Sequence, residues 1–404
     1  MDPRCNPFSP GAGLRPPELA GRQEQLADFE AMIARSEDGL PSSPLVLFGL
    51  RGVGKTVLLE AFQALAEVAG WQTMNLEAVS AGPDLGPASR RLARELERVR
   101  HRVVRRRGFA EAVKAIDSFS LNAGLTGGGV ATRRREPDRA PLDLELALLD
   151  VVDTLGPRLA KDRTGLALFI DELQDLDPAV VGAVIAAQHR AAQRGWPFVL
   201  VGAGLPSVRG KLAAVRSYAE RFNYAMVDKL DTESSRAALA QPAERLDVRF
   251  DSAGLDLIAG ESQGYPFFLQ TFGYQAWRLG SGTEITQADC RQAIANGWAE
   301  LDEGFFISRW DRATKAERGF LEAMLPTPPG PSALARPDPQ TSAGIAADAV
   351  PVGQIAKRTG KMASQLSTTR AALIAKGLVY APERGRLAFT VPGIAAFIQR
   401  RSER

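Results

Sequence analysis

Short apolar runs alternate with longer amphipathic segments through the first 229 residues of the chain. The runs are bounded by glycine, proline and polar residues, which is typical of buried strands, and the segments between them have the three- and four-residue spacing of helices. We expect strands at 45–48, 72–76, 166–172, 196–202 and 224–227. Strands that alternate with helices form parallel sheets covered on both faces, so this part of the chain predicts an α/β core.

The pattern changes after this core, because residues 230–300 have helical periodicity throughout. We expect four helices there, at 232–246, 252–261, 266–279 and 286–294. Short helices without strands cannot extend the parallel sheet, and we therefore predict an all-α lid that follows the core.

The last hundred residues contain a second change of pattern. The segment 326–348 carries six prolines, and we expect a disordered loop there. After it, the periodicity predicts a strand, two helices, a hairpin and a final helix, at 350–353, 354–359, 361–376, 378–391 and from 392 onward. This order of elements predicts a winged helix-turn-helix domain.

The length and composition of the chain indicate that it forms more than one domain. A chain of 404 residues is too long for one core, and its 45% hydrophobic and 24% charged residues are typical of globular proteins. The proline- and glycine-rich start is expected to be disordered. We divide the chain into a disordered N-terminus at 1–15, a core at 16–229 with an insertion at 80–141, a lid at 230–300 and the winged helix-turn-helix domain at 301–404.

The sequence argues against a membrane protein and against a protein stabilised by disulfide bonds. The sequence has no apolar run near eighteen residues and no signal pattern at its start, so we expect a cytoplasmic protein without membrane association. Cys5 and Cys290 lie far apart and form no C-x-x-C pair. Neither a disulfide framework nor a zinc site is expected.

Basic residues are unevenly distributed, although the net charge is only +3. Nine arginines lie between 90 and 107 against two glutamates, and seven basic residues lie between 353 and 386 against one. We expect the first group to lie on an amphipathic helix from 88 to 108, most of whose arginines are solvated. The apolar positions expected to face the core are Leu92, Leu96, Val99 and Val103. The insertion around this helix is expected to become ordered only with a partner or nucleic acid.

The strand predicted at 45–48 runs directly into the sequence GLRGVGKT, and a nearly apolar helix follows. This string fits G-x4-G-K-[ST] between a strand and a helix, which is the context of a phosphate-binding loop. Glycines let its N–H groups turn toward a phosphate, and the helix adds the positive end of its dipole. We expect Lys55 to reach the β- and γ-phosphates of ATP and Thr56 to bind Mg²⁺. The expected nucleotide contacts are Gly49, Leu50, Arg51, Gly52, Val53, Gly54, Lys55, Thr56 and Val57.

Two acidic residues, Asp171 and Glu172, end the apolar strand that begins at Leu166. The carboxyl ends of parallel strands meet at one edge of a sheet, and these acids are therefore expected near the phosphate loop. Asp171 would hold Mg²⁺, directly or through water, and Glu172 would polarise the attacking water. Because phosphoryl transfer depends on positioning and charge stabilisation, the two acids and Lys55 predict an ATP hydrolase.

A further box, Gly21-Arg22 with Leu26, stands 28 residues before the phosphate loop. The chain resembles the AAA+ and STAND ATPases related to the Orc1/Cdc6 initiators in five features. These are the Gly-Arg box, the phosphate loop, the Asp-Glu strand, the helical lid and the winged helix. The resemblance covers about residues 15 to 400. It implies ATP binding between core and lid, with Gly21 and Arg22 on the adenine side. For this box alone, an ordinary helix N-terminus is the alternative.

The resemblance also implies roles for Pro266 and Arg221. Gly264-Tyr265-Pro266 resembles the G-x-P motif of STAND switches, whose proline meets the adenine or ribose; the alternative is a helix end followed by a helix start. Arg221 stands where such ATPases carry an arginine finger, which serves a neighbouring copy in a homo-oligomer. A surface ion pair is the alternative for Arg221, and Arg216 and Arg209 are the next candidates.

Two departures from this family stand out. The strand at 196–202 is followed by small apolar residues, where a polar sensor residue is usual, and the start of the helix at 266 has no nearby arginine until Arg278. Sensing of the γ-phosphate from the strand is therefore in doubt.

The winged helix suggests duplex DNA as a partner. On the helix at 361–376, the 100° spacing predicts a buried stripe of Met362, Leu366, Thr369 and Leu373. The same spacing leaves a small neutral face of Ser364, Ser367, Thr368 and Ala371 exposed. Base recognition is therefore expected to be poor, and phosphate contacts would come from Lys357, Arg358, Lys361, Lys376, Arg384 and Arg386.

These observations lead to two functional hypotheses. In the first, a slow ATPase uses its nucleotide state to control DNA engagement through the winged helix. In the second, the protein is a nucleotide-dependent switch or oligomeric scaffold whose winged helix binds a protein partner in signalling or defence. The basic residues favour the first, and the missing sensor residues and the neutral helix face favour the second.

Overall fold

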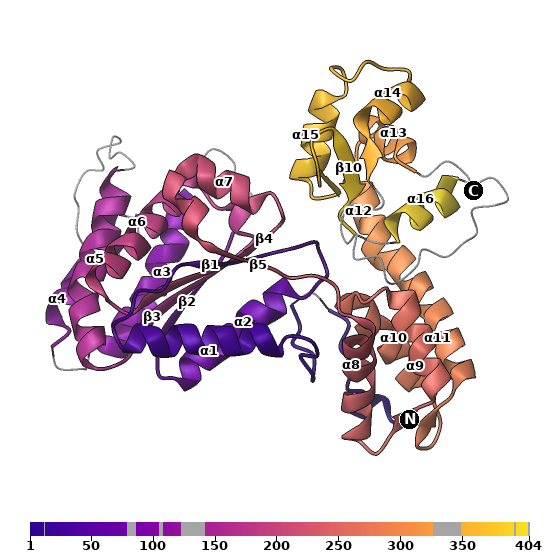
Figure 1. The fold of residues 1–404 in the computed structure, drawn as a ribbon, viewed down its shortest axis with the longest axis horizontal. Coiled ribbons are helices and arrows are strands. Elements are labelled where there is room, and N and C mark those ends of the chain that lie inside the picture. The colour runs from indigo at the N-terminus through magenta and orange to yellow at the C-terminus, as the bar shows by residue number, and fades with distance from the viewer. Residues whose placement is uncertain are drawn as a thin grey trace.

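The computed structural model describes residues 1–11, 13–78, 86–104, 108–122, 142–325, 349–391 and 393–402. Figure 1 shows three parts: a core built on a sheet, a group of helices beside it, and a smaller domain above those helices. Several parts of segments that the sequence singled out lie outside the described residues, namely the loop at 326–348, the arginines at 105–107, and residues 79–85 and 123–141 of the insertion and its approach.

The core sheet has five parallel strands in the order β2-β3-β4-β1-β5. The strands are β1 (Leu45–Phe48), β2 (Gln72–Glu77), β3 (Leu166–Asp171), β4 (Phe198–Gly204) and β5 (Asn223–Met226). All five agree with the predicted positions to within two residues, because each is a short run with a clear boundary. The predicted α/β fold class with a parallel core sheet is confirmed.

Helices cover both faces of this sheet (Figure 1). Successive residues of a strand point to opposite faces. Leu45 and Leu47 accordingly pack in one apolar core, with Phe29 and Phe62, while Val46 packs in the other. The helices are α1 (Gln23–Glu37), α2 (Lys55–Val68), α3 (Gly86–Val103), α4 (Ala110–Asn122), α5 (Leu142–Lys161), α6 (Pro178–Arg194) and α7 (Val208–Val215).

Helices α3 and α4 lie within the predicted insertion. Helix α3 packs against β2, and α4 packs against α3 and α5. The predicted apolar stripe of α3 is confirmed, since Leu92, Leu96, Val99 and Val103 are all buried. Phe109, Ile116 and Phe119 are buried with them. The expectation that the insertion becomes ordered only with a partner was wrong for these two helices, because their apolar faces complete the second core.

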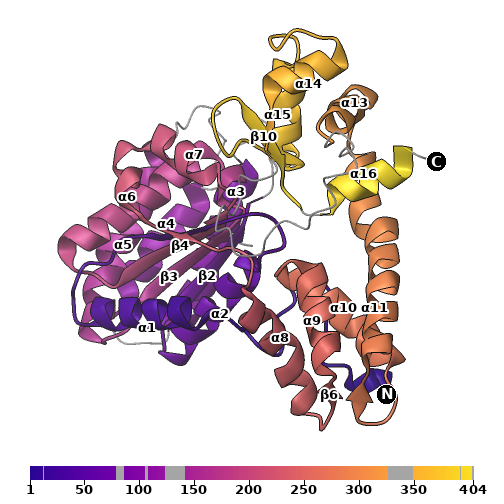
Figure 2. The ribbon, with the colours of Figure 1, turned by 45° about the vertical axis from the view of Figure 1, so that its right-hand side comes forward.

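A helical lid follows, as predicted, but two short strands within it show that the expectation of an all-α lid was wrong in that detail. It consists of α8 (Thr232–Glu244), α9 (Ser252–Ser262), α10 (Pro266–Leu279) and α11 (Gln287–Glu300), with a two-stranded parallel sheet of β6 (Arg249–Phe250) and β7 (Glu284–Ile285). Helix α11 continues through a π-helical turn, η4 (Leu301–Phe306), into α12 (Ile307–Asp311). Figure 2 shows this continuous helix as the connection between the lid and the last domain.

The first residues of the chain pack against the lid. Phe8 is buried, the N-terminal amine donates a hydrogen bond to the carbonyl oxygen of Gly280, and the Trp277 indole donates to the carbonyl oxygen of Asp2. The expectation of a disordered 1–15 segment was therefore wrong for residues 1–11. Proline and glycine made it look structureless, but its one phenylalanine fills a gap in the lid core, next to Gly273.

The C-terminal domain has a three-stranded antiparallel sheet in the order β8-β10-β9, surrounded by helices. Its elements are α13 (Lys315–Ala323), β8 (Val350–Pro351), α14 (Val352–Thr359), α15 (Ser367–Ala375), β9 (Val379–Tyr380), β10 (Arg386–Phe389) and α16 (Ile394–Ser402). Their order follows the predicted one, but α15 begins six residues later than expected. Met362 precedes the helix and is 67% exposed, so its predicted burial was wrong.

Candidate active site

The phosphate loop connects the end of β1 to the start of α2, at the carboxyl edge of the sheet. Gly49 packs so closely on the loop after β5 that a Cβ would lie 2.1 Å from the Val227 carbonyl oxygen. Gly52 and Gly54 have φ angles of 81° and 93°, in the left-handed region that side chains avoid. A Cβ at Gly54 would meet no described atom within 4 Å. The loop is thus tight on its outer side and open where a phosphate would approach.

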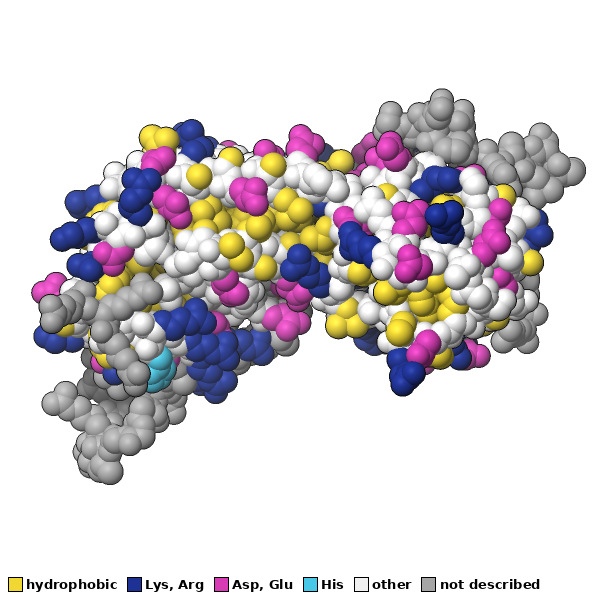
Figure 3. Space-filling model, turned by 90° about the horizontal axis from the view of Figure 1, so that it is seen from below, with side chains coloured by type: hydrophobic (Ala, Val, Ile, Leu, Met, Phe, Trp, Pro, Cys, Tyr) yellow, Lys and Arg dark blue, Asp and Glu magenta, His cyan; other side chains and the backbone are white. Residues whose placement is uncertain are grey.

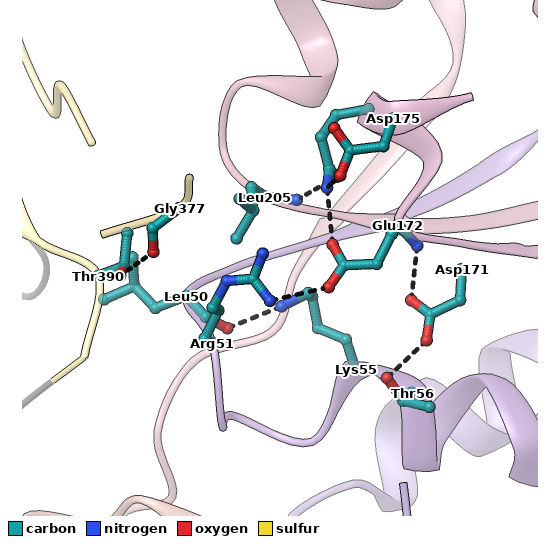
Figure 4. A network of polar contacts seen from close by, with 11 residues as sticks. Leu50, Arg51, Lys55, Thr56, Asp171, Glu172, Asp175, Leu205, Gly377 and Thr390 are labelled. Carbon is teal, nitrogen blue, oxygen red and sulfur yellow. Dashed lines mark hydrogen bonds and ion pairs between the residues drawn. The ribbon is translucent and has the colours of Figure 1, made fainter. Parts of the chain in front are cut away.

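Lys55 is the first residue of α2 and is buried under this loop. Its Nζ donates a hydrogen bond of 2.7 Å to the Leu50 carbonyl oxygen (Figure 4). Burial lowers the pKa of Lys55 from 10.5 to about 8, and the nearby Glu172 and Asp171 carboxylates only partly oppose this effect. The site therefore holds an ammonium that lacks a full counter-charge, which the phosphates of a nucleotide would supply.

Thr56 and Asp171 meet across the edge of the sheet. The Thr56 hydroxyl donates to Oδ2 of Asp171 at 2.7 Å, and the Glu172 N–H donates to Oδ1 of the same carboxylate at 2.7 Å. The described residues contain no group of three or more His, Cys, Asp or Glu that could hold a metal. One hydroxyl and one carboxylate fit Mg²⁺, which binds through few protein ligands together with phosphate oxygens and water.

Glu172 has both carboxylate oxygens engaged. Oε1 forms an ion pair of 3.1 Å with Nη1 of Arg51 from the phosphate loop, and Oε2 accepts a 2.6 Å hydrogen bond from Nε2 of Gln174 (Figure 4). Glu172 also has a φ of 48°, which is uncommon for a residue with a long side chain. Neither partner was predicted from the sequence, because Gln174 belongs to no motif and Arg51 occupies a variable position of its motif.

The Gly21-Arg22 box lies behind the phosphate loop. Arg22 is buried, and its Nη2 donates to the carbonyl oxygens of Val53 at 3.1 Å and Asp228 at 2.5 Å. Burial lowers the pKa of its guanidinium. Gly21 has a φ of 68° and faces Ser234 of the lid. The box thus joins the phosphate loop, the end of the core and the lid.

Pro266 opens α10 beside the phosphate loop. Gly264 precedes it and packs so tightly that a Cβ would lie 2.1 Å from the Leu230 carbonyl oxygen. A Cβ at Gly52 of the phosphate loop would lie 3.8 Å from Cβ of Phe267. The lid therefore presents the start of α10 to the phosphate loop, in the region where the sequence placed a nucleotide contact.

The C-terminal domain also reaches the phosphate loop. Gly377, which has a φ of 64° and lies between α15 and β9, leaves room for Arg51: a Cβ there would be 2.9 Å from Nε and Nη2 of Arg51. Arg309 of α12 lies 3.5 Å from the centre of the Phe305 ring, which in turn stacks against Phe267. Burial, with the nearby charges of Arg51 and Arg312, lowers the pKa of Arg309 to about 10. Sequence reasoning missed this arginine, because α12 is distant from every motif.

The three arginine-finger candidates have different surroundings. Arg209 stacks on the rings of Phe48 and Tyr224 at 4.2 and 4.7 Å, and Arg216 forms an ion pair with Glu145. Arg221 ends the short helix η3 (Ser217–Arg221) before β5 and is exposed. The ion pairs among the described residues do not include Arg221, so the alternative of a surface ion pair is not seen there.

The basic residues of the C-terminal domain fall into two groups. Arg358 donates to the carbonyl oxygens of Ala323 and Leu325, and Arg386 donates to that of Ala349 at 2.6 Å. The Lys376 ammonium lies 2.6 Å from Oε2 of the buried Glu317. These three side chains hold the domain together. Arg358 is exposed despite these contacts, as are Lys357, Lys361 and Arg384.

The core carries its own basic surface. Arg94, Arg98 and Arg102 of α3 are exposed at four-residue spacing, with His101 among them. Seen from below, Lys and Arg side chains gather beside a histidine at the end of the molecule that holds the core (Figure 3). None of the described helices is long and apolar enough to span a membrane.

Comparison with protein families matches two parts of the chain. Residues 18–201 match the family described as an AAA ATPase domain, which spans β1 to β4 and both acidic residues of the site. Residues 303–398 match a domain of unknown function (DUF8462). No protein of curated function matches the sequence.

Three solved structures illustrate the similarity of this chain to known folds. A Walker-type ATPase of Pyrococcus abyssi is 13% identical with a TM-score of 0.56, and the match covers 95% of this chain and 97% of that chain. Cdc6p from Pyrobaculum aerophilum is 14% identical with a TM-score of 0.46, over 100% and 99%. The RuvB Holliday junction branch migration motor of Thermotoga maritima is 16% identical with a TM-score of 0.46, over 96% and 99%. Residues 18–201 are therefore similar to the AAA ATPase domain family, and the chain shares the fold of the Walker-type ATPase.

Proposed function

We propose that this protein binds ATP with Mg²⁺, hydrolyses it slowly, and uses the nucleotide state to control DNA engagement by its C-terminal domain. The observation that carries the ATPase proposal is the contact between Thr56 and Asp171, 2.7 Å apart, beside the buried Lys55. Lys55 and Thr56 begin helix α2 and Asp171 ends strand β3, and together they form a set of hydroxyl, carboxylate and ammonium groups at one edge of the sheet.

Each group has a distinct task in this proposal. The glycines of the phosphate loop turn backbone N–H groups toward the phosphates, and Lys55 exchanges the Leu50 carbonyl for the β- and γ-phosphate oxygens. Thr56 and Asp171 would hold Mg²⁺, which neutralises charge on those phosphates. Glu172 orients the attacking water and takes its proton.

Slow hydrolysis follows from the contacts of Glu172. A general base needs a free oxygen within hydrogen-bond reach of the water it activates. Both oxygens of Glu172 are engaged, one by Arg51 and the other by Gln174. Hydrolysis therefore waits for Arg51 to release Oε1 of Glu172.

Arg51 connects the nucleotide to the C-terminal domain. Its guanidinium pairs with Glu172 and lies against Gly377. A bound triphosphate offers Arg51 a stronger anionic partner, since charge-assisted pairing of arginine with phosphate is among the strongest polar contacts. Movement of Arg51 toward the phosphates would change its contact at Gly377, which biases the position of the C-terminal domain.

Duplex DNA is the partner that we propose for this domain, as a winged helix-turn-helix. Four of the six basic residues expected to contact phosphates are exposed, namely Lys357, Arg358, Lys361 and Arg384. Lys357, Lys361 and Arg384 support this role most directly, because Arg358 also donates to two carbonyl oxygens of its own domain. Arg358, Lys376 and Arg386 are assigned instead to internal contacts. The alternative, docking of a protein partner, is favoured by the neutral exposed face of Ser364, Ser367, Thr368 and Ala371 next to the exposed Met362.

A homo-oligomer is part of the same proposal, with Arg221 as the arginine finger. Arg221 is exposed at the edge of the core, whereas Arg209 and Arg216 are held by ring and carboxylate contacts within the chain. Only Arg221 of the three is therefore available to a neighbouring copy without loss of an internal contact.

ATP binding is tested by titrating a fluorescent ATP analogue into the wild type and Lys55→Ala. We expect the variant to lose detectable binding, because the loop then lacks its only buried cation. Equal affinity would contradict the site.

DNA engagement is tested by a mobility shift with duplex DNA at several salt concentrations, with and without ATP. The triple variant Lys357→Ala, Lys361→Ala, Arg384→Ala should weaken binding on every sequence and lower the salt slope by about 3, roughly one per phosphate contact. Arg163→Ala, which removes a cation of the core that pairs with Asp38, is the matched control. No shift at low salt in any nucleotide state would favour the protein-partner alternative, which sizing chromatography would then examine.

A further inference from the structure

Gln174 lies in the short turn η2 (Leu173–Asp175) that directly follows Glu172. Its side chain is 6% exposed although it is polar, and every polar atom of its amide group has a partner. Nε2 donates to Oε2 of Glu172 at 2.6 Å and to Oδ2 of Asp175 at 3.1 Å, and Oε1 accepts from the Leu205 N–H at 2.9 Å. The amide therefore joins the end of β4 to Glu172 (Figure 4).

The orientation of this amide is determined by its surroundings. The Leu205 N–H can only donate, so it must face the oxygen of the Gln174 amide. The nitrogen then faces the two carboxylates, which can accept from it. A reversed amide would place an oxygen against Glu172 and a nitrogen against an N–H group, and both contacts would be repulsive. The backbone of β4 thus ensures that Glu172 receives a donor.

The strand end next to this amide leaves room for it. A Cβ at Gly204 would lie 2.6 Å from Oε1 of Gln174, so the last position of β4 cannot carry a side chain while the amide occupies this place. The Lys211 ammonium also donates a hydrogen bond of 2.7 Å to the backbone carbonyl oxygen of Gln174. This second contact anchors the turn that carries the amide side chain. The residues at the end of β4 are small and apolar, so they offer no polar side chain to the site. Gln174 places its amide group at this strand end instead.

We propose that Gln174 is the positioning residue for Glu172 in ATP hydrolysis; this inference rests on the proposed ATPase function. It holds Oε2, so that Oε1 faces the attacking water once Arg51 has moved to the phosphates. In the step itself, the water oxygen forms a bond to the γ-phosphorus, the bond from that phosphorus to the bridging oxygen breaks to release ADP, and Oε1 accepts the water proton. Because Gln174 also holds Leu205, it couples the end of β4 to the orientation of the base.

The test compares single-turnover hydrolysis and ATP affinity for the wild type, Gln174→Ala, Glu172→Gln and the double variant. We expect Gln174→Ala to lower the rate about 10- to 100-fold with ATP affinity unchanged, since a misplaced base loses most of its contribution. In the Glu172→Gln background, the same change should have no further effect, because Gln174 acts only through Glu172. If Gln174 had a purely structural role, its loss would lower the hydrolysis rate by the same factor in the wild-type and Glu172→Gln backgrounds. That result would overturn the proposal.

Two further variants keep this result interpretable. Gln174→Glu has the same size and keeps an oxygen toward Leu205, but it replaces the donor with a second carboxylate, so it should fold and be at least as slow as Gln174→Ala. Gln188→Ala removes another buried glutamine, which donates to the Ser42 carbonyl oxygen away from the site, and it should hydrolyse ATP at the wild-type rate. Wild-type rates for both Gln174 variants, with Glu172→Gln inactive, would overturn the role of Gln174 and leave the ATPase function standing. If the wild-type protein itself did not hydrolyse ATP, the proposed ATPase function would be overturned.

Discussion

Lys55 is a buried cation whose pKa is strongly lowered. Burial disfavours its charged form, and the pKa of about 8 lies below the value of 10.5 that the same side chain has in water. Between these two values the unfolded chain binds more protons than the folded one, so the nucleotide-free protein gains stability as pH rises from about 8 to about 10.5. Below pH 8, the cost of keeping the buried ammonium charged is fully present.

This perturbation predicts proton uptake on ATP binding. The triphosphate favours the charged form and raises the pKa of Lys55, so at pH 8 about half a proton should be taken up per nucleotide bound. ATP affinity should accordingly fall as pH rises above 8. Calorimetry in two buffers of different ionisation enthalpy measures this uptake. No uptake between pH 8 and 9 would show that Lys55 stays charged without nucleotide.

Arg51 leads to a second prediction about single residues. Its pair with Glu172 is about 30% exposed on each side, and pairs of this kind are worth at most about 1 kcal/mol. Arg51→Ala should therefore raise kcat by no more than about fivefold, through release of Glu172, and should also raise KM because a phosphate contact is lost. Arg163→Ala, which breaks an exposed pair with Asp38 in the core, is the control. A tenfold lower kcat with unchanged KM would contradict the holding role of Arg51.

At the scale of elements, α3 and α4 belong to the core and not to an appended segment. The apolar face of α3 packs into the second core, while its arginines face solvent. A fully buried leucine in such a helix makes contacts on all sides, and its truncation leaves a cavity.

This packing predicts different effects for two neighbouring positions of α3. Leu96→Ala should lower the free energy of unfolding by about 2 to 5 kcal/mol, because Leu96 is fully buried. Arg94→Ala, on the exposed side of the same helix, should change it by less than about 0.5 kcal/mol. Urea unfolding followed by circular dichroism compares the two. An unchanged urea midpoint for Leu96→Ala would show that α3 is not part of the core.

The elements themselves could be predicted well from the sequence. The strands that carry the phosphate loop and the acids are short apolar runs with motifs at their ends, so local information is sufficient. The shift in the start of α15 had a local cause that periodicity could not show: Met362 to Leu366 form turns in which Met362 points to solvent. Periodicity alone also assigned Met362 to a buried stripe, because it assumes a continuous helix.

At the scale of the whole molecule, three distant segments meet at the phosphate loop. Arg22 binds its backbone from one side, Phe267 of the lid contacts Gly52, and Gly377 of the C-terminal domain packs on Arg51. A ligand that changes the loop thus affects both other domains directly. This arrangement is the physical basis for the proposed nucleotide-dependent movement.

These long-range contacts could not be predicted from the sequence. Gln174, Arg309 and Gly377 belong to no motif, and their relevance depends on which segments the fold brings together. The internal contacts of Arg358, Lys376 and Arg386 could not be predicted for the same reason, since a basic residue near a predicted wing can also bind a carbonyl or carboxylate of its own domain. The burial of Phe8 against the lid is a further example.

The central claim, that Glu172 activates water at a bound ATP beside Lys55, is tested most directly by one measurement. Single-turnover hydrolysis by Glu172→Gln should be at least about 100-fold slower than by the wild type while ATP remains bound with equal affinity, because an amide cannot accept the water proton. Hydrolysis by this variant at the wild-type rate would contradict the account.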